Sequence, residues 1–398
     1  MRRVVVTGIG VVTPLGNSLD ELAEGLLTGR SGAGPITLFE PAQLPTRIAA
    51  QVETIGLPDH PDRKQSFALA ASEQAMAGQT LDPAQGGLSL GIGLDLFSMP
   101  DLVDYLRHHG LPPGADPQTF LQTPSELCIQ AICRRFGLSY PPQTHISACA
   151  ASTDAIGSAF RTIRRGQRQW MLAGGSDSMI NPMGVAGFCK IRATTTRNHA
   201  PAQASRPFDR GRDGFLLGEG AAVLLLEERH AALARGAVCY GEVLGYGNSF
   251  DAHGISEPHP QGLGAVLAMQ RALSDAGVDP ERIVYVNAHG TSTPKNDPIE
   301  TLALRTVFGS HADRLWVSST KSMLGHLISA SGAVEVAATL ACARRGQVHP
   351  TLNLEQPDPA CDLDYVAEGP RPLPAGSLML KNSFAFGGQN ACLVLGQG

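Results

Sequence analysis

Short apolar runs alternate with amphipathic helix patterns along the chain, and this alternation limits the possible folds more than any other feature. The opening run VVVTGIGVV precedes a helix pattern in which Ser18 and Glu21 form a capping box. Residues 262–277 have the periodicity of a helix. Runs rich in Val, Leu and Ile, typical of buried strands, lie at residues 170–175, 221–227 and 283–288. Strands that alternate with helices predict an α/β fold.

The sequence also contains an internal similarity. Residues 215–226 (FLLGEGAAVLLL) and 384–395 (FAFGGQNACLVL) both run from a phenylalanine through a glycine turn into an apolar strand. Because these segments close the two parts of the chain, we expect two related halves packed together, residues 1–238 and 239–398. A chain of 398 residues can bury a large core.

Composition argues against several classes of protein. A net charge of −5 gives no overall attraction for nucleic acid or for an anionic membrane. The eight cysteines include no CxxC pair, which argues against a zinc ribbon or a disulfide framework. No apolar stretch approaches the roughly twenty residues that span a bilayer, and Gly8, Gly10 and Pro14 interrupt the opening run. We therefore expect a cytoplasmic protein that binds neither nucleic acid nor membrane.

Between residues 94 and 140 the pattern is weak. The segment at residues 108–127, HHGLPPGADPQTFLQTPSEL, is rich in Pro and Gly, as connecting segments are. We expect a loop there that acts as a lid or as a pocket insertion.

Cys149 lies in the stretch HISACAAS, just before a helix pattern with Ile156, Phe160 and Ile163 on one face. At the start of a helix, free backbone N–H groups and the helix dipole lower the pKa of a thiol and favour the thiolate. The local pattern therefore makes Cys149 a candidate nucleophile. An unreactive core cysteine is the alternative, since free cysteines are among the most often buried residues.

Two histidines in the second half follow predicted strands. His289 comes directly after one strand, and His326 lies in a turn of small residues after the next. Lys321 precedes His326 in that turn, and Glu335 lies on the helix that follows. Ligands collect at the carboxyl ends of strands in α/β sheets, so Cys149 and the two histidines are expected to share one site.

The segment after His289 also begins a helix. Asp297, Pro298 and Glu300 match the cap, the first and the third positions of a helix. Capping accounts for all three residues at this stage.

Two segments rich in glycine have more than one interpretation. In NSFAFGGQNA, Gly387 and Gly388 permit a backbone that points N–H groups into a site as oxyanion donors, although a simple hairpin turn fits equally well. GIGVVT near the start imitates a dinucleotide-binding fingerprint, but Thr13 stands where the third glycine belongs.

Taken together, these segments resemble the β-ketoacyl-acyl carrier protein synthases, the condensing enzymes of type II fatty acid and polyketide synthesis. The resemblance covers almost the whole chain, in six ordered blocks: RRVVVTGIGVVTPLG, SACA, SRPFDRGRDGFLLGEGA, VNAHGTSTPKND, STKSMLGH and NSFAFGG. It implies the thiolase fold, with duplicated βαβαβαββ halves in a five-layered αβαβα sandwich.

The resemblance implies a role for each candidate residue. Cys149 would be the nucleophile that accepts the acyl group, and His289 with His326 would promote decarboxylation. Lys321 would support the charge balance of the site, with Glu335 behind it. Phe386 resembles the family's gating phenylalanine, and its backbone N–H with that of Cys149 would form the oxyanion hole.

Further residues would receive the substrate carrier. Thr291 and Thr293 resemble residues that hydrogen-bond the phosphopantetheine arm. The carrier protein of this family is acidic, and the basic residues expected to receive it are Arg63, Lys64, Arg192 and Arg197.

The implied reaction is a decarboxylative Claisen condensation of an acyl group on Cys149 with malonyl-carrier, which gives a 3-oxoacyl-carrier. The resemblance implies no metal and no bound cofactor, because the phosphopantetheine arm arrives on the acyl carrier protein. A second copy of the chain, or a related ketosynthase-like subunit, is the other expected partner.

Departures from the family pattern leave the acyl substrate open. The middle region is short, Ala385 stands where glycine is usual, and Gln389 stands where threonine or histidine is common. An enzyme of aryl polyene or other polyketide synthesis is therefore one alternative. A non-catalytic chain-length or scaffold partner is a second, and an NAD(P)-dependent oxidoreductase, suggested only by GIGVVT, is a third. A thiolase would need a second cysteine near the C-terminus, but Cys392 lies inside a predicted strand.

Overall fold

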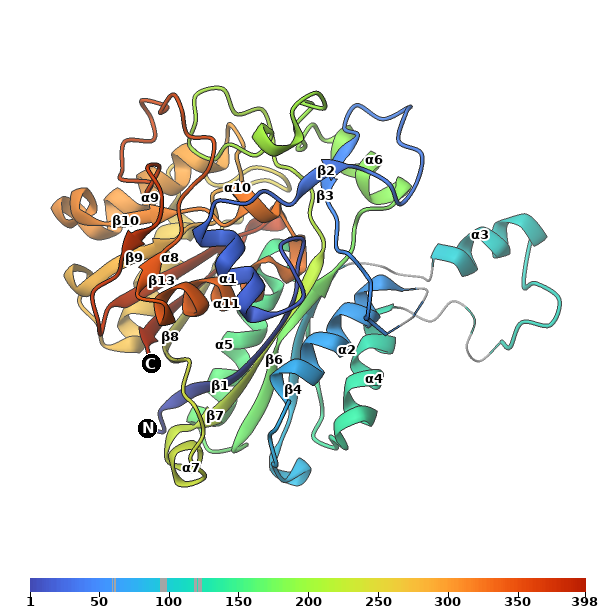
Figure 1. The fold of residues 1–398 in the computed structure, drawn as a ribbon, viewed down its shortest axis with the longest axis horizontal. Helices are drawn as coiled ribbons and strands as arrows, with labels where there is room; N and C mark the ends of the chain where they lie inside the picture. Colours follow the sequence, from blue (N-terminus) through green and yellow to red (C-terminus); the bar gives the residue numbers. More distant parts are fainter. Residues whose placement is uncertain (59, 61, 94–98, 118–119, 121–123) are drawn as a thin grey trace.

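The computed structural model describes residues 1–398 except 59, 61, 94–98, 118–119 and 121–123 (Figure 1). Five strands of the first half pair in the order β1-β7-β6-β4-β5. β1 pairs antiparallel with β7 and β7 with β6, whereas β6, β4 and β5 run parallel. These strands are β1 (Val4–Val12), β4 (Leu88–Ile92), β5 (Gln143–His145), β6 (Trp170–Asp177) and β7 (Gly220–Glu228).

The second half repeats this arrangement, in the order β8-β14-β13-β9-β10. β8 and β14 are antiparallel, as are β14 and β13, whereas β13, β9 and β10 are parallel. The strands are β8 (Gly241–Phe250), β9 (Ile283–Asn287), β10 (Trp316–Ser318), β13 (Leu378–Phe384) and β14 (Gln389–Gln397). β7 and β14, which the internal sequence similarity relates, occupy the same place in the two halves.

The two halves meet where β1 and β8 pair through Val4–Val6 and Gly241–Val243, which joins all ten strands into one sheet. The division predicted between residues 238 and 239 falls in the segment before β8, and it stays a prediction.

Helices form three layers around the strands (Figure 1). α2 (Arg63–Ala75) and α4 (Pro124–Phe136) pack on the first half, and α8 (Leu263–Ala276) and α9 (Asn296–Phe308) pack on the second. α5 (Ala151–Arg164) and α11 (Ser331–Arg344) contact each other and strands of both halves. α11 is buried at every position from Ser331 to Ala343, as a helix enclosed on all sides must be.

The remaining elements lie around this core. They are α1 (Leu19–Leu27), β2 (Ala33–Pro35), β3 (Ile48–Ala50), α3 (Met99–His108), α6 (Pro182–Lys190), α7 (Arg229–Ala234), α10 (Lys321–Leu324), β11 (Gln347–Val348) and β12 (Arg371–Pro372). Ser18 caps α1, as predicted. In the part of the chain that the structure describes, no helix combines the length and the apolar character that crossing a bilayer requires.

The first five residues of GIGVVT lie in the buried strand β1, and Thr13 follows directly after its end. A Cβ atom on Gly8 would lie 2.1 Å from the carbonyl oxygen of Ala75, and one on Gly10 would lie 1.8 Å from that of Ala71. The two glycines therefore let α2 approach β1 closely. A dinucleotide fingerprint needs the turn between a strand and a helix, so the observation that suggested an oxidoreductase is explained by packing.

The middle region contains helices at both ends of the predicted loop. α3 ends at His108 and α4 begins at Pro124, so the prediction of a loop over residues 108–127 is wrong at its first residue and over its last four. Parts of it, residues 118–119 and 121–123, lie outside the described residues. α3 stands away from the body of the molecule (Figure 1), and its Val103, Tyr105 and Leu106 are 40%, 41% and 62% exposed.

Candidate active site

Cys149 lies in a short 3-10 turn, Ala148–Ala150, between β5 and α5. Ala148 has a positive φ of 47°, which costs a residue with a Cβ about 1–2 kcal/mol. The same turn precedes α11 in the second half, where Ile328 has a φ of 43°. The duplicated fold thus presents the first turn of each central helix in the same way, and Cys149 is 3% exposed.

Burial raises the pKa of Cys149 to about 11, although Lys321 and the backbone N–H of Phe386 act in the opposite direction. The lowered pKa expected from the helix start is therefore wrong in direction, because removal from water outweighs the local dipoles. The N–H of Phe386 nevertheless hydrogen-bonds the sulfur. This contact places the donor beside the nucleophile, within reach of the oxyanion that would form when the sulfur attacks a carbonyl carbon.

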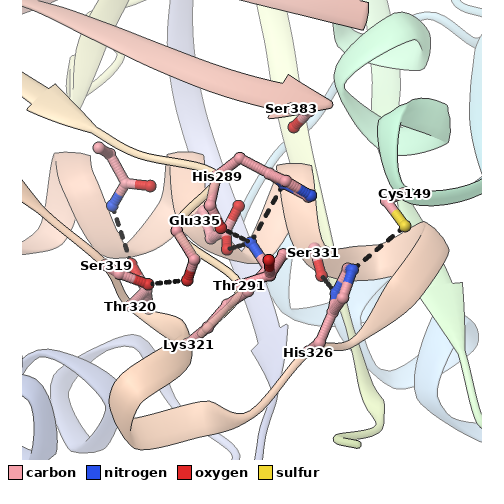
Figure 2. Close-up of polar contacts among 12 residues, drawn as sticks. Cys149, His289, Thr291, Ser319, Thr320, Lys321, His326, Ser331, Glu335 and Ser383 are labelled. Atoms are coloured by element: carbon pink, nitrogen blue, oxygen red, sulfur yellow. Dashed lines mark hydrogen bonds and ion pairs between the residues drawn. The ribbon is translucent and has the colours of Figure 1, made fainter. Parts of the chain in front are cut away.

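His326 faces the sulfur of Cys149, with 3.1 Å between Nε2 and Sγ (Figure 2). Its Nδ1 accepts a hydrogen bond from the backbone N–H of Ile328 at 3.2 Å and lies 2.8 Å from the hydroxyl of Ser331. Because Nδ1 is an acceptor, the proton of the neutral ring is on Nε2. The ring therefore presents an N–H to the sulfur.

His289 lies beside His326, with 5.4 Å between the ring centroids. Nζ of Lys321 is 3.5 Å from its Nδ1 and donates to its backbone carbonyl at 2.7 Å. An ammonium group can only donate, so this contact also leaves the proton of His289 on Nε2. Figure 2 shows the other ring nitrogen turned toward Cys149.

Both imidazoles are neutral near neutral pH. Burial lowers the pKa of His289 and of His326 well below 6.5, and the charges of Lys321 and Lys381 act in the same direction. Two neutral N–H donors therefore face one buried thiol.

Glu335 on α11 supports the site from behind. Its Oε1 lies 2.5 Å from Nζ of Lys321, and both side chains are almost fully buried. Its Oε2 lies 2.8 Å from Nζ of Lys381 on β13, a residue that the sequence analysis missed. The signal for Lys381 was a charged residue inside the apolar strand pattern LMLKNSF.

Asp297 and Glu300 do not cap α9, which has no side-chain cap at its start. Glu300 instead accepts the backbone N–H groups of His289 and Gly290, each at 2.8 Å. Asp297 accepts the N–H groups of Thr291 and Phe208, at 3.1 and 2.9 Å. The capping interpretation is therefore wrong, since these carboxylates hold the turn that carries His289.

A pocket leads to the three candidate residues. Phe215, Phe384 and Phe386 supply apolar walls. Thr291 and Thr293 also line it, with 2.8 Å between their hydroxyl oxygens. A neighbouring pocket that shares Thr293 and Phe386 reaches Arg192.

The segment with Phe386 is both a hairpin turn and part of the site. It joins β13 to β14, and Gly387 and Gly388 have φ of 83° and 80°, which glycine adopts readily. Ala385 is extended, with a φ of −117°. An alanine therefore fits at that position without strain.

The four basic residues predicted to dock a carrier protein have different surroundings in the structure. Arg63 pairs with the buried Glu219, and the Lys64 side chain is only 1% exposed. Lys64 cannot meet a partner protein, so that expectation is wrong. Arg63 keeps 24% of its side chain exposed beside its ion pair, and its place in docking stays a prediction. Arg197 donates to the carbonyl of Gly211, whereas Arg192 is exposed at the pocket.

Donor atoms of Cys149, His289 and His326 all lie within 4.8 Å of one another. A thiol and two imidazoles are groups that Zn²⁺ also accepts as ligands, but both Nε2 atoms carry protons here, so the three groups are arranged as a thiol and two hydrogen-bond donors.

Comparisons with known proteins match this geometry to one family. Residues 1–232 match the family model for the N-terminal domain of β-ketoacyl synthases, and residues 240–355 match the model for the C-terminal domain. The chain belongs to the β-ketoacyl synthase family. The 3-oxoacyl-[acyl-carrier-protein] synthase 2 of Synechocystis sp. is 42% identical over 99% of this chain and 97% of its own. That of Coxiella burnetii is 40% identical over 99% and 98%.

Solved structures of the family superpose on the whole chain. A β-ketoacyl synthase from Burkholderia phymatum gives a TM-score of 0.90 at 35% identity and covers 100% of both chains. A ketosynthase bound to a hexaketide, in complex with a type II polyketide synthase acyl-carrier protein, gives 0.88 at 30% identity over 100% and 99%. The ishigamide ketosynthase/chain length factor gives 0.88 at 32% identity over 100% and 99%. The predicted thiolase fold is confirmed.

Proposed function

We propose that the chain catalyses the decarboxylative condensation of an acyl group with malonyl-carrier to give a 3-oxoacyl-carrier, with Cys149 as nucleophile. The observation that carries this proposal is the buried thiol of Cys149 beside two neutral imidazoles, each with its Nε2–H free to face the pocket. The names of the relatives support the same reaction.

In the first step the sulfur of Cys149 attacks the thioester carbonyl of an acyl-carrier. Burial of Cys149 disfavours its thiolate, and the Nε2–H of His326 stabilises that thiolate by a hydrogen bond. The backbone N–H groups of Phe386 and Cys149 would hold the oxyanion of the tetrahedral intermediate. The bond from carbonyl carbon to carrier sulfur breaks, and the thiol proton ends on the carrier.

In the second step malonyl-carrier loses its carboxylate as CO2, and the electron pair of the broken C–C bond remains as an enolate. Nε2–H groups of His289 and His326 would donate to the enolate oxygen, which explains why two imidazoles face the pocket. The enolate carbon then attacks the acyl carbonyl, a new C–C bond forms, and the bond to Cys149 breaks. Uptake of one proton restores the thiol.

The phosphopantetheine arm of an acyl carrier protein would enter along Thr291 and Thr293, which line the pocket. Arg192 is exposed where the neighbouring pocket opens, so it is the best placed of the four predicted basic residues to meet an acidic carrier. The related ketosynthase in complex with its carrier supports this partner.

We also propose that the chain functions as a dimer, with itself or with a related subunit. β5 is the last strand in the sheet order, and Ile146 directly after it is 53% exposed. An edge strand beside apolar side chains is a surface that proteins commonly cover. α3, with its exposed apolar residues, lies between β4 and β5 in the sequence, and we include it in the proposed dimer surface.

Condensation itself tests the proposed reaction. Purified protein that is incubated with a saturated fatty acyl-carrier and malonyl-carrier is expected to form a 3-oxoacyl-carrier. Mass spectrometry of the carrier detects this product. Cys149→Ala should abolish the product, whereas Cys239→Ala, at a half-buried cysteine remote from the pocket, should retain it. Product formation by Cys149→Ala would overturn the proposal, and product only from an unsaturated polyketide carrier would change its substrate.

A further inference from the structure

Glu335 bridges two buried lysines. Lys321 contacts one carboxylate oxygen at 2.5 Å and Lys381 contacts the other at 2.8 Å. The Lys381 side chain is 0% exposed and lies on a fully buried part of β13, between Leu380 and Asn382. Burial of an ammonium group costs several kcal/mol unless it is well paired, so this position demands a specific environment.

The surroundings of Lys381 provide that environment. Its Nζ also donates to the backbone carbonyl of Asn382 and lies 3.2 Å from the hydroxyl of Ser383. Ser383 is held in turn by Thr153, with 2.8 Å between the two hydroxyl oxygens. The ammonium group therefore has a carboxylate, a carbonyl and a hydroxyl around it, and Lys381 is not among the described residues that line the pocket at Cys149.

Charges of opposite sign lie together in this cluster. The charged and titratable groups that face the two histidines, or that support those groups, are Cys149, Asp177, Glu300, Lys321, Glu335 and Lys381. Behind the histidines, Glu335 forms ion pairs with both lysines, whereas the charge of Glu300 acts on Lys381 from a longer distance. Without Lys381, the Oε2 atom of the buried Glu335 would lose its ion pair.

A chain of contacts leads from Lys381 to the imidazole of His289. Lys381 holds one oxygen of Glu335, Glu335 holds Lys321, and Lys321 faces Nδ1 of the ring. We infer that Lys381 is a positioning residue for decarboxylation, because it completes the ion cluster that keeps Lys321 against His289. This inference rests on the proposed function of the histidine pair.

The charge of Lys381 also favours the neutral form of both rings. A proton on Nδ1 of His289 would oppose the ammonium of Lys321 and disturb the orientation of the ring. Loss of Lys381 removes one positive charge, so it should raise the pKa of both imidazoles and make protonation easier.

The test compares Lys381→Met and Lys381→Ala with the wild type. Malonyl-carrier decarboxylation is measured from pH 5 to 8, and acylation of Cys149 is measured by intact mass. We expect both variants to acylate within a few-fold of wild type and to decarboxylate roughly tenfold more slowly, as loss of one charge-assisted contact predicts. The acid limb of the pH profile should move up by about one unit.

Two controls separate positioning from general damage. Lys64→Met removes another buried lysine that is outside the pocket lining, and it should leave the acid limb in place, because its charge acts on Asp177 and not on either histidine. Methylammonium or K⁺ should restore activity and thermal stability to Lys381→Ala, because a small cation can replace the missing charge, whereas tetramethylammonium should not.

Wild-type rates with an unchanged acid limb in Lys381→Met would overturn the inference, as would indifference of Lys381→Ala to small cations in both activity and melting temperature. Failure of the wild type to acylate Cys149 would instead overturn the proposed function, so the two failures are distinguishable.

Discussion

At the scale of single residues, the site depends on which nitrogen of each imidazole holds the proton. Ile328 donates to Nδ1 of His326, and Lys321 faces Nδ1 of His289. Both rings therefore keep Nε2–H for the pocket, a pattern that needs a fixed backbone donor in one case and a buried ammonium in the other. The two histidines differ in their relation to Cys149, since only His326 contacts the sulfur.

This difference predicts separable effects of the two rings. His289→Ala should lower malonyl decarboxylation by about 100-fold or more, as loss of one donor to a developing oxyanion does. Acylation of Cys149 should stay within a few-fold of wild type, because His326 still contacts the sulfur. Rates of CO2 release and of adduct formation are compared, with the exposed His230→Ala as control. Equal losses in both steps would contradict the assignment.

At the scale of elements, the hairpin turn at residues 385–388 places the N–H of Phe386 against the sulfur. Gly387 and Gly388 both adopt positive φ, but their surroundings differ. A Cβ on Gly388 would lie 3.1 Å from that of Asp251, whereas a Cβ on Gly387 would meet nothing within 4 Å. The turn is therefore crowded on one side only.

Alanine at the two glycines should then have unequal effects. Gly388→Ala adds crowding to a strained φ and should slow acylation of Cys149 roughly tenfold, with a cost of about 1–3 kcal/mol in the free energy of unfolding. Gly387→Ala, the matched control, meets only the backbone strain of about 1–2 kcal/mol. The acylation rate of Cys149 and the free energy of unfolding in urea are measured for both variants. A larger loss in Gly387→Ala than in Gly388→Ala would refute this account of the turn.

At the scale of the whole molecule, the duplicated topology explains how much could be predicted. Strand patterns and the similarity of residues 215–226 to 384–395 predicted two related halves, and residue types at strand ends predicted the Cys149, His289 and His326 set. The functions of Lys381 and Glu300 could not be predicted, because their partners come from other elements. A raised thiol pKa also depends on burial, which no local pattern contains.

The buried core also predicts how stability varies with pH. His349 is enclosed by Tyr285, Asn287, Ser318 and Thr320, and burial lowers its pKa to about 4. Between pH 6.5 and 4 the unfolded chain binds a proton that the native chain does not, so stability falls as the pH falls.

His349→Gln should remove the part of the pH dependence of stability that comes from this histidine. In urea unfolding, the wild type should lose up to about 1.4 kcal/mol more per pH unit than the variant over that interval. The slopes are compared, so that a uniform destabilisation of the variant cancels. Parallel slopes would show that His349 does not titrate in this way.

Assembly is also a property of the whole molecule. Leu106→Glu on α3 should weaken the proposed dimer, whereas Leu233→Glu, at a leucine that is 52% exposed on α7, should not. Sedimentation velocity across a range of concentrations distinguishes the two variants. A wild type that stays monomeric alone would direct the search to a related subunit.

The central claim is that Cys149 carries the acyl group, and intact-mass measurement tests it most directly. After incubation with an octanoyl-carrier, the wild type and Cys239→Ala should each gain one octanoyl group, and Cys149→Ala should gain none. Addition of malonyl-carrier should then remove the group as a 3-oxoacyl product on the carrier. An adduct that persists on Cys149→Ala, or one on the wild type that malonyl-carrier does not discharge, would contradict the account.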